Sequence, residues 1–382
     1  MLPAALRCAL LTPWLLALSA AAEPASCVAP LRPAAAGPVP AASSPARLAA
    51  LPVVRFAGVE YVSLREAAAL LGMKTSWAEK ERRLTLLDQA GKAEFEADSR
   101  EISLHGLRLF LGKAVLLRNG ALYVSRIDFE RALATRLQPA VLGAPPSRPR
   151  VIVLDPGHGG NDNGMENKRL GLKEKVLTLD VAQRLKKLLE VRGYRVVLTR
   201  NDDRQLGPDK PTDFKKRAEI ANRAGADLFV SIHFNSLYPD TKTSGTETYT
   251  FTREFQRSDR AASPLEPDDT EREPAPVNRF DPWSALLQQL VHREVIGSLK
   301  TLDRGQKTMH SAVLRELDCP AVLVESVFVS NDGEANRVAT AGYRQQIAEA
   351  IAAGIQAYAD TLAALQPKPP AAPAVSPPSS QP

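Results

Sequence analysis

Two histidines and two glutamates, far apart along the chain, have the side chains best suited to chemistry. His158 stands in V-I-V-L-D-P-G-H-G-G, Glu174 in G-L-K-E-K, His233 in L-F-V-S-I-H-F-N and Glu325 in A-V-L-V-E-S. Imidazole and carboxylate groups are ligands of catalytic Zn²⁺ sites, which take three protein ligands and leave one position open. A fourth acidic group beside such an ion can carry protons. If the four side chains converge, they form the site of a zinc hydrolase.

Predicted strands and helices place these four residues at positions where they can meet. Buried-strand patterns at 151–154, 227–232 and 321–325 lead to His158, His233 and Glu325. Glu174 begins a predicted helix that extends to residue 192. Functional groups in open α/β sheets gather beyond the carboxyl ends of the strands. The four groups are therefore expected to point into one crevice.

The region 150–365 alternates strand and helix patterns, which predicts an α/β fold with a mainly parallel sheet and helices on both faces. Further strand patterns cover 194–199 and 245–251. Further helical patterns cover 213–224, with Asp213 or Thr212 as its N-cap, 282–302 and 342–365. Between residues 253 and 281 the sequence is charged and contains proline, which predicts a surface insertion. That insertion is either a disordered loop or a lid or regulatory segment that overhangs the crevice.

A smaller α+β domain is predicted before this region, at 51–140. Two similar segments, beginning at Tyr61 and Tyr123, each place a short strand before a serine N-cap and an amphipathic helix. Short alternating segments separated by glycines lie between them. This domain contains no group of residues suited to catalysis, and a binding, spacing or purely structural role is expected. A proline-containing linker at 141–149 joins the two domains.

The first 22 residues have the pattern of a secretory signal peptide. Arg7 precedes an apolar run at 8–18, and alanines at 20–22 offer a small-residue cleavage site. The run is too short to span a bilayer comfortably and contains Pro13. We therefore expect cleavage, no transmembrane anchor afterwards, and a protein exported to the periplasm or cell envelope. Segments rich in Ala and Pro at 23–50 and rich in Pro at 366–382 predict a linker and a tail without a packed core.

The cysteines leave two alternatives at the exported N-terminus. Cys27 can pair with Cys319 in an oxidising compartment, or it can be a lipidated N-terminal residue. The preceding Pro24, Ala25 and Ser26 include no aliphatic residue of the kind that lipidation signals carry, which argues against lipid attachment.

The net charge of +6 is only moderately basic. It indicates either an ordinary solvated surface or attraction to a polyanion such as a cell-wall polymer. No basic run is interleaved with aromatic residues, so nucleic-acid binding is excluded. We expect a monomer.

Several polar residues are candidates for supporting roles around the crevice. Asp155 can accept a hydrogen bond from a ligand imidazole or from backbone amides of its turn. Arg200 and Arg217 can hold a carboxylate of the substrate or form ion pairs that brace the sheet against a helix, and Asn235 is a further candidate for substrate or support. His292, on a predicted helix, is expected to be exposed. His310 is expected to precede a strand and is an additional candidate ligand.

These motifs resemble the zinc-dependent N-acetylmuramoyl-L-alanine amidases of the type-3 amidase family, over about residues 150–362. The matching strings are D-P-G-H-G-G at 155–160, G-L-K-E-K at 171–175, R-A-E-I-A-N at 217–222, S-I-H-F-N at 231–235, D-R-G-Q-K at 303–307 and P-A-V-L-V-E-S at 320–326. The resemblance implies that His158, Glu174 and His233 hold one Zn²⁺ per chain and that Glu325 is the catalytic carboxylate. Residues 51–140 resemble the N-terminal domain of copper amine oxidases.

The resemblance implies hydrolysis of the amide that joins N-acetylmuramic acid to L-alanine of the peptidoglycan stem peptide. Wall remodelling or daughter-cell separation, with an activator protein as a candidate partner, follows from the same resemblance. Two alternatives remain: a non-catalytic wall-binding protein with an amidase fold, and a zinc peptidase acting on stem peptides. Val327 stands where the family usually has glycine, and its side chain is expected to restrict the backbone next to Glu325.

Overall fold

The computed structural model describes residues 48–366, except 90, 143, 257 and 260–273. The predicted signal peptide, Cys27 and the C-terminal tail from residue 367 lie outside the described residues, as do parts of the predicted 23–50 linker and 253–281 insertion. Cys319 is buried, and it forms no disulfide with any residue that the structure describes. Among the helices of the described part, none combines the length and apolarity needed to cross a lipid bilayer.

The C-terminal region is built on a mainly parallel sheet, as predicted. Four parallel strands lie in the order β13 (Arg195–Leu198), β10 (Val151–Pro156), β14 (Leu228–Asn235) and β17 (Ala321–Phe328). Next to β17 lies β15 (Thr246–Phe251), which is antiparallel to it, and then β16 (Asp303–Met309), which is parallel to β15. The central strands are nearly continuous runs of Val, Ile and Leu, as expected for strands buried on both faces.

Helices cover both faces of this sheet. One face packs against α5 (Glu174–Val191), α7 (Asp281–Leu299) and α10 (Ala341–Leu365), and the other packs against α6 (Lys210–Ala224) and α8 (Ala312–Arg315). In α5 the buried residues Leu177, Val181, Leu185 and Leu189 recur every four positions and form an apolar stripe. Each such side chain contributes about 1.5–3 kcal/mol through its burial.

The structure differs from the predicted elements at two places that matter for the site. Helix α6 begins at Lys210, and Asp209 is its N-cap, accepting a hydrogen bond from Thr212 N. The predicted N-cap at Asp213 or Thr212 is therefore wrong; the Asp213 carboxylate instead accepts from Arg217 Nε. The second difference is β16, whose sequence D-R-G-Q-K-T-M is too polar to show a strand pattern.

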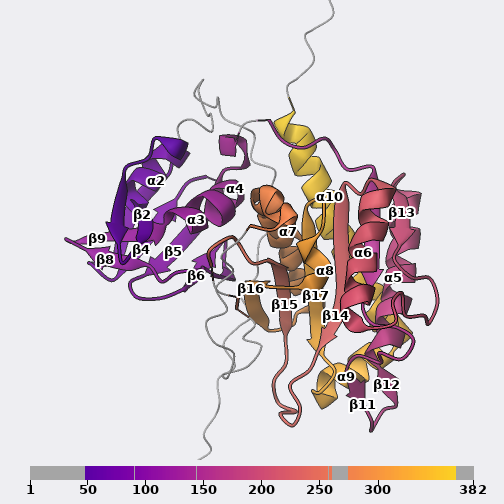
Figure 1. Ribbon diagram of the computed structural model, residues 1–382. Coiled ribbons are helices and arrows are strands. Elements are labelled where there is room, and N and C mark those ends of the chain that lie inside the picture. The colour runs from indigo at the N-terminus through magenta and orange to yellow at the C-terminus, as the bar shows by residue number, and fades with distance from the viewer. Residues whose placement is uncertain (1–47, 90, 143, 257, 260–273, 367–382) are drawn as a thin grey trace, which may run out of the picture. The chain divides into compact units, whose positions relative to one another are not determined.

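Three segments between the main elements lie at the end of the sheet where β14 and β17 end (Figure 1). They are the hairpin of β11 (Glu166–Asn167) and β12 (Leu172–Lys173), the connection from β14 to β15, and helix α9 (Asp332–Ala339). Asn331 caps α9 and also donates hydrogen bonds to Thr241 O and Lys242 O of the β14–β15 connection. The carboxyl end of the parallel strands is thus framed by ordered loops.

The preceding domain contains short strands and helices with a core of its own. Its elements are β1 (Val53–Phe56), β2 (Val59–Ser63), α2 (Leu64–Leu71), β3 (Lys74–Glu79), β4 (Arg83–Leu87), β5 (Lys92–Glu96), β6 (Glu101–Leu104), β7 (Leu107–Phe110), β8 (Leu116–Arg118), β9 (Ala121–Ser125), α3 (Arg126–Asp128), the π-helix η1 (Phe129–Leu133), α4 (Ala134–Leu137) and the 3-10 helix η2 (Pro139–Leu142). Ser63 and Ser125 cap α2 and α3, which confirms both predicted serine N-caps. Strand β7 pairs with β16 through Leu109 and Gln306, so the two regions share one eleven-stranded sheet.

Candidate metal centre

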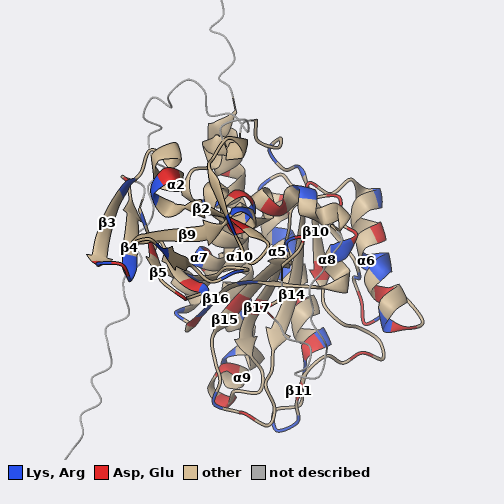
Figure 2. Cartoon of the chain, turned by 60° about the vertical axis from the view of Figure 1, so that its left-hand side comes forward, with Lys and Arg blue, Asp and Glu red and all other residues tan. Residues whose placement is uncertain are grey.

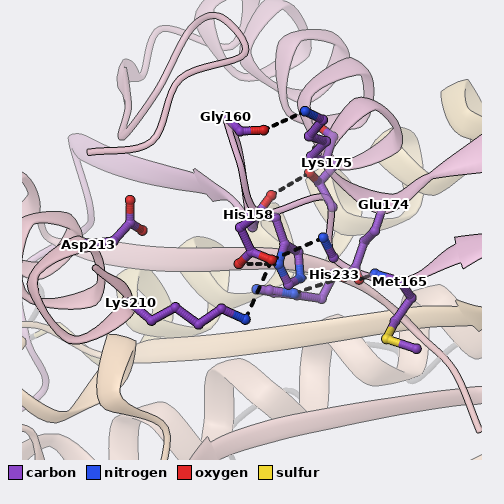
Figure 3. Close-up of polar contacts among 12 residues, drawn as sticks. His158, Gly160, Met165, Glu174, Lys175, Lys210, Asp213 and His233 are labelled. Atoms are coloured by element: carbon purple, nitrogen blue, oxygen red, sulfur yellow. Dashed lines mark hydrogen bonds and ion pairs between the residues drawn. The ribbon is translucent and has the colours of Figure 1, made fainter. Parts of the chain in front are cut away.

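His158, Glu174 and His233 converge at the carboxyl end of β10 and β14 (Figure 3). Glu174 Oε1 lies 3.1 Å from His158 Nε2 and 3.0 Å from His233 Nδ1. The two imidazole rings meet edge to face, with centroids 5.0 Å apart. One oxygen and two nitrogens from three separate segments therefore face a common point.

The local backbone explains how the two histidines come so close. His158 has a φ of 64°, a conformation that is uncommon for a residue with a side chain and that often occurs at functional sites. Gly157, just before it, lies against the other ring: a Cβ there would be 2.2 Å from His233 Cε1. Glycine at 157 is thus required for the ring of His233 to lie beside the turn.

Glu174 is fixed by the protein backbone as well as by the histidines. Its Oε1 accepts a hydrogen bond from Phe234 N at 3.0 Å, and its Oε2 accepts one from Met165 N at 2.8 Å. As the first residue of α5, it also lies at the helix N-terminus, where a negative charge is stabilised. The carboxylate is therefore held in one orientation before any ligand binds.

The charges of these groups are strongly coupled. Burial lowers the pKa of His158, but Glu174 and Asp162 outweigh this effect and raise it to about 9. Burial raises the pKa of Glu174, but hydrogen bonds and charges from the two histidines hold it well below its ordinary value. The carboxylate is thus ionised and is balanced by imidazole protons, which a cation can replace.

Asp162 supports His158 and was missed by the sequence reasoning, which assigned a supporting role to Asp155. Its Oδ2 lies 2.9 Å from His158 Nδ1, the ring nitrogen that faces away from Glu174. Carboxylates in this position fix the tautomer and orientation of ligating imidazoles. Lys210 Nζ lies 3.6 Å from the other oxygen of Asp162. The position of Asp162, four residues after His158 in the same turn, was the sequence feature that could have identified it.

Glu325 lies on the neighbouring strand. It is paired in register with His233 of β14, and only 3% of its surface is exposed. A cavity of about 180 Å³ is lined by this glutamate together with His158, Glu174, His233 and Asn235. The structure thus brings all four residues of the predicted crevice to one cavity.

Asp155 and Arg217 also line this cavity, and Arg200 shares the Pro156 carbonyl with Arg217. Asp155 accepts hydrogen bonds from Thr199, Ser231 and Arg217, and no described imidazole hydrogen-bonds to it, although, against the effect of burial, the charge of His233 helps to lower its pKa. Arg217 donates to Asp155, Asp213 and the carbonyl oxygens of Pro156 and His158. Arg200 donates to the carbonyl oxygens of Pro156, Gly157, Lys175 and Asp202. These contacts favour the bracing alternative for Arg217, which forms ion pairs with Asp155 and Asp213, whereas Arg200 donates to backbone oxygens.

The remaining histidines do not join this centre. His292 is fully buried, which makes the predicted exposure wrong: its ring bridges Thr248 and Asp303, because α7 packs directly on β15 and β16. His310 follows β16 rather than preceding a strand, and its ring lies against Phe251.

Val327 lies two residues after Glu325 on β17, and its expected restriction of the backbone there stays a prediction. A register shift in the pairing of β14 with β17 lies between Glu325 and Phe328, and the Val327 side chain packs in the core with Val322 and Val324. Its side chain therefore does not line the cavity.

An α/β protein with a His–Glu–His centre and a nearby carboxylate has the features of a metal-dependent hydrolase. Comparison with known families supports this class. The family model of N-acetylmuramoyl-L-alanine amidases matches residues 152–357, more than half of the chain, and the model of the copper amine oxidase N-terminal domain matches residues 43–139.

Individual relatives give the same result. The chain is 32% identical over 228 residues to the uncharacterized protein YqiI of Bacillus subtilis, covering 60% of this chain and 94% of that protein. It is 33% identical over 228 residues to N-acetylmuramoyl-L-alanine amidase AmiA of Escherichia coli, covering 55% and 76%. It is also 33% identical over 210 residues to an uncharacterized cell wall amidase of Bacillus anthracis, of which it spans only 35%.

The chain belongs to the N-acetylmuramoyl-L-alanine amidase family. The predicted family, the amidase class of enzyme and the general function of a peptidoglycan amidase are confirmed by these matches.

Proposed function

We propose that this chain is a zinc-dependent amidase that hydrolyses the bond between the lactyl group of N-acetylmuramic acid and L-alanine of the stem peptide. The observation that carries the proposal is the convergence of His158, Glu174, His233 and Glu325 on one cavity. The family of the chain supports the choice of bond.

The three donor residues fit zinc. Zinc in proteins is tetrahedral with bonds of about 2.1 Å to nitrogen and oxygen, which separates its ligand atoms by about 3.4 Å. The separations of 3.0 and 3.1 Å between Glu174 and the two histidines are close to this value. Three protein ligands are the number found in catalytic zinc sites. A bound zinc would activate water and polarise the scissile carbonyl.

Glu325 is the proton carrier in this proposal. It lines the same cavity as the three donors, one strand away from His233. Its carboxylate would take a proton from the attacking water and deliver that proton to the departing amino group of L-alanine. The group is nearly excluded from solvent, which would strengthen its interactions with the water and the amine in the cavity.

The cell-envelope setting is part of the proposal. Peptidoglycan lies outside the cytoplasm, which agrees with the predicted signal peptide at 1–22, a segment outside the described residues. The relative in Bacillus anthracis is described as a cell wall amidase. An activator protein and a role in wall remodelling or cell separation remain predictions from the family resemblance.

The decisive experiment is product analysis of purified cell walls digested by the metal-loaded protein. We expect new N-terminal L-alanine and intact glycan chains, and no release after treatment with a chelator. Glu325→Gln should keep its zinc and lose turnover, whereas Glu349→Gln, on the exposed side of α10, is the matched control. Cleavage within the stem peptide would instead identify a peptidase. Wall binding without any released product would identify a binding protein.

A further inference from the structure

A row of charged side chains continues from the metal centre across the next two strands. Glu325 on β17 is paired in register with His233 on one side and with Glu247 of β15 on the other. Residues paired across strands project to the same face of a sheet. Glu247 therefore lies on the face that carries the cavity, two strands from His233, which is about 10 Å at a strand spacing of about 4.8 Å.

Glu247 is buried and its carboxylate is saturated with donors. Its Oε1 accepts from Arg304 Nε at 2.9 Å and from Lys307 Nζ at 2.8 Å, both from β16. Its Oε2 accepts from Tyr249 at 2.5 Å and from Asn235 Nδ2 at 2.8 Å. Asn235 lines the cavity, so this network is physically connected to the proposed reaction site.

The cluster has more positive than negative charge. Burial raises the pKa of Glu247, but Lys307 and Arg304 outweigh it and keep the pKa below its ordinary value, so one carboxylate faces two cations. Of the other acidic groups, Asp303 accepts from His292 and from Arg108 N, Glu101 pairs with the Arg108 side chain, and Glu334, on which the Arg304 charge also acts, pairs with Arg337. Glu247, Arg304 and Lys307 by themselves carry one net positive charge.

The two cations remain accessible. Their side chains are 30% exposed in Arg304 and 17% in Lys307, although Glu247 between them is buried. Arg304 uses Nε for Glu247, and no described residue accepts from its two terminal nitrogens; its guanidinium lies over the Phe328 ring, 5.1 Å from the centroid. The terminal edge of a guanidinium is the part that binds carboxylates in a forked geometry. Figure 2 shows basic and acidic residues next to one another around β15 and β16.

A ring from the preceding domain contacts the same cluster. Lys307 Nζ lies 5.4 Å from the centroid of Phe110 of β7. Gly305, between the two cations, has a φ of 98°, and a Cβ there would be 2.6 Å from the Phe110 ring. Glycine at 305 thus permits the Phe110 ring to approach Lys307. The ring then occupies one side of the space next to the two cations.

We infer that Arg304 and Lys307 bind a carboxylate in the peptide part of the substrate, and that Glu247 positions both cations and Asn235. The inference rests on the proposed function for its substrate. An extended chain advances about 3.3–3.6 Å per residue, so a carboxylate two or three residues beyond the scissile amide reaches a point about 10 Å away. The acidic stem peptide, rather than the glycan, is then the feature this end of the sheet recognises.

The test compares two muramoyl-peptide substrates that differ only in whether their peptide carboxylates are free or amidated. The wild-type enzyme should prefer the free form by about tenfold or more in kcat/KM, with most of the effect in KM. Arg304→Gln and Lys307→Gln should each remove most of that preference, because kcat/KM for the free-carboxylate substrate should fall far more than kcat/KM for the amidated substrate. Arg304→Lys should restore part of it, and Arg279→Gln, an exposed arginine paired with Asp318, is the control.

Two outcomes would overturn the inference: equal cleavage of both substrates by the wild-type enzyme, or equal losses on both substrates in the Arg304 and Lys307 variants. Binding of the two substrates to the Glu325→Gln protein, measured by calorimetry, gives a readout that does not depend on turnover. Failure of the proposed function would appear as inactivity toward both substrates in the wild-type protein. In that case, a preference for the free carboxylate in binding still supports the cation pair, and its absence rejects it.

Discussion

Two arginine–carboxylate clusters lie on the same sheet, and they differ in how completely their donors are used. In the first, Arg217 pairs with Asp155 and Asp213, and every guanidinium nitrogen donates to a protein oxygen. In the second, Arg304 donates to Glu247 through one nitrogen only. The Arg217 side chain is 2% exposed, whereas that of Arg304 is 30% exposed.

The comparison shows how the contacts of an arginine separate bracing from binding. A buried guanidinium with all of its donors used has nothing left for a ligand, and removing it strands buried carboxylates. A partly exposed guanidinium with free donors contributes little to folding but retains capacity for an anion. Along the sheet, the proposed metal centre on β10 and β14 lies between Arg217, which contacts Asp155 of β10, and Arg304 of β16.

The largest effect is expected from the metal centre itself, which neither cluster should match. His233→Ala removes one of three donors, so zinc content should fall and kcat/KM should drop by roughly 1000-fold or more. Zinc analysis and wall digestion measure the two effects. Full activity with normal zinc content in this variant would contradict the assignment of the centre.

The next largest effect should fall on stability and distinguish the two arginines. Arg217→Met leaves Asp155 and Asp213 buried with an unpaired charge, and should lower the free energy of unfolding by about 3–5 kcal/mol. Arg304→Met should change it by less than about 1 kcal/mol. Denaturant titrations of both variants provide the comparison. Similar losses in both variants would mean that the two arginines contribute equally to stability. Adding Asp155→Asn to Arg217→Met should recover part of the loss, because it removes one of the unpaired buried charges.

A smaller effect should follow from loosening a single ligand. Asp162→Ala frees the His158 ring to rotate, and should weaken zinc affinity by about 10- to 100-fold while the fold stays intact. Competition with a chromophoric chelator measures the affinity. Asp332→Ala, an exposed aspartate paired with Arg169, is the control, and equal affinities in the two variants would remove Asp162 from the metal centre.

The smallest effect concerns Asp281, a third buried carboxylate, whose hydrogen bonds come from the neutral Asn278 side chain. Burial raises its pKa from an ordinary 3.8 to about 7, against the opposing effects of Asn278 and Arg253. The folded state therefore favours the protonated form: the stabilisation is full below about pH 4 and is lost as the pH rises through 7.

Asp281→Asn should remove this pH dependence, by an amount on the order of 1 kcal/mol between pH 6 and pH 7. Urea midpoints of the variant and the wild-type protein at the two pH values give the difference. An unchanged pH dependence in the variant would show that Asp281 is ionised in the folded protein throughout this range.

The sequence by itself determined the family, the fold class and the four residues that meet at the cavity. Strand patterns ending in His233 and Glu325 are local, and a parallel sheet brings its carboxyl ends to one edge whatever the loops do. The D-P-G-H-G-G turn likewise predicts that another group approaches the backbone closely, because glycine has no Cβ to prevent this. These inferences required no knowledge of which side chains touch.

Only the tertiary structure decided what the other charged residues do. Arg200 and Arg217 were candidates for substrate binding, and Asp155 for holding an imidazole or its own turn. In the structure Arg217 donates to Asp155 and Arg200 donates to backbone carbonyls, whereas Asp162 and Glu247 were not singled out from the sequence. The physical reason is that bracing and binding use the same residue types. They differ in burial and in how many donors remain unused, and both quantities depend on partners distant in the sequence. The polar strand β16 was missed for a related reason, since its place in the sheet comes from its neighbours rather than from its own pattern.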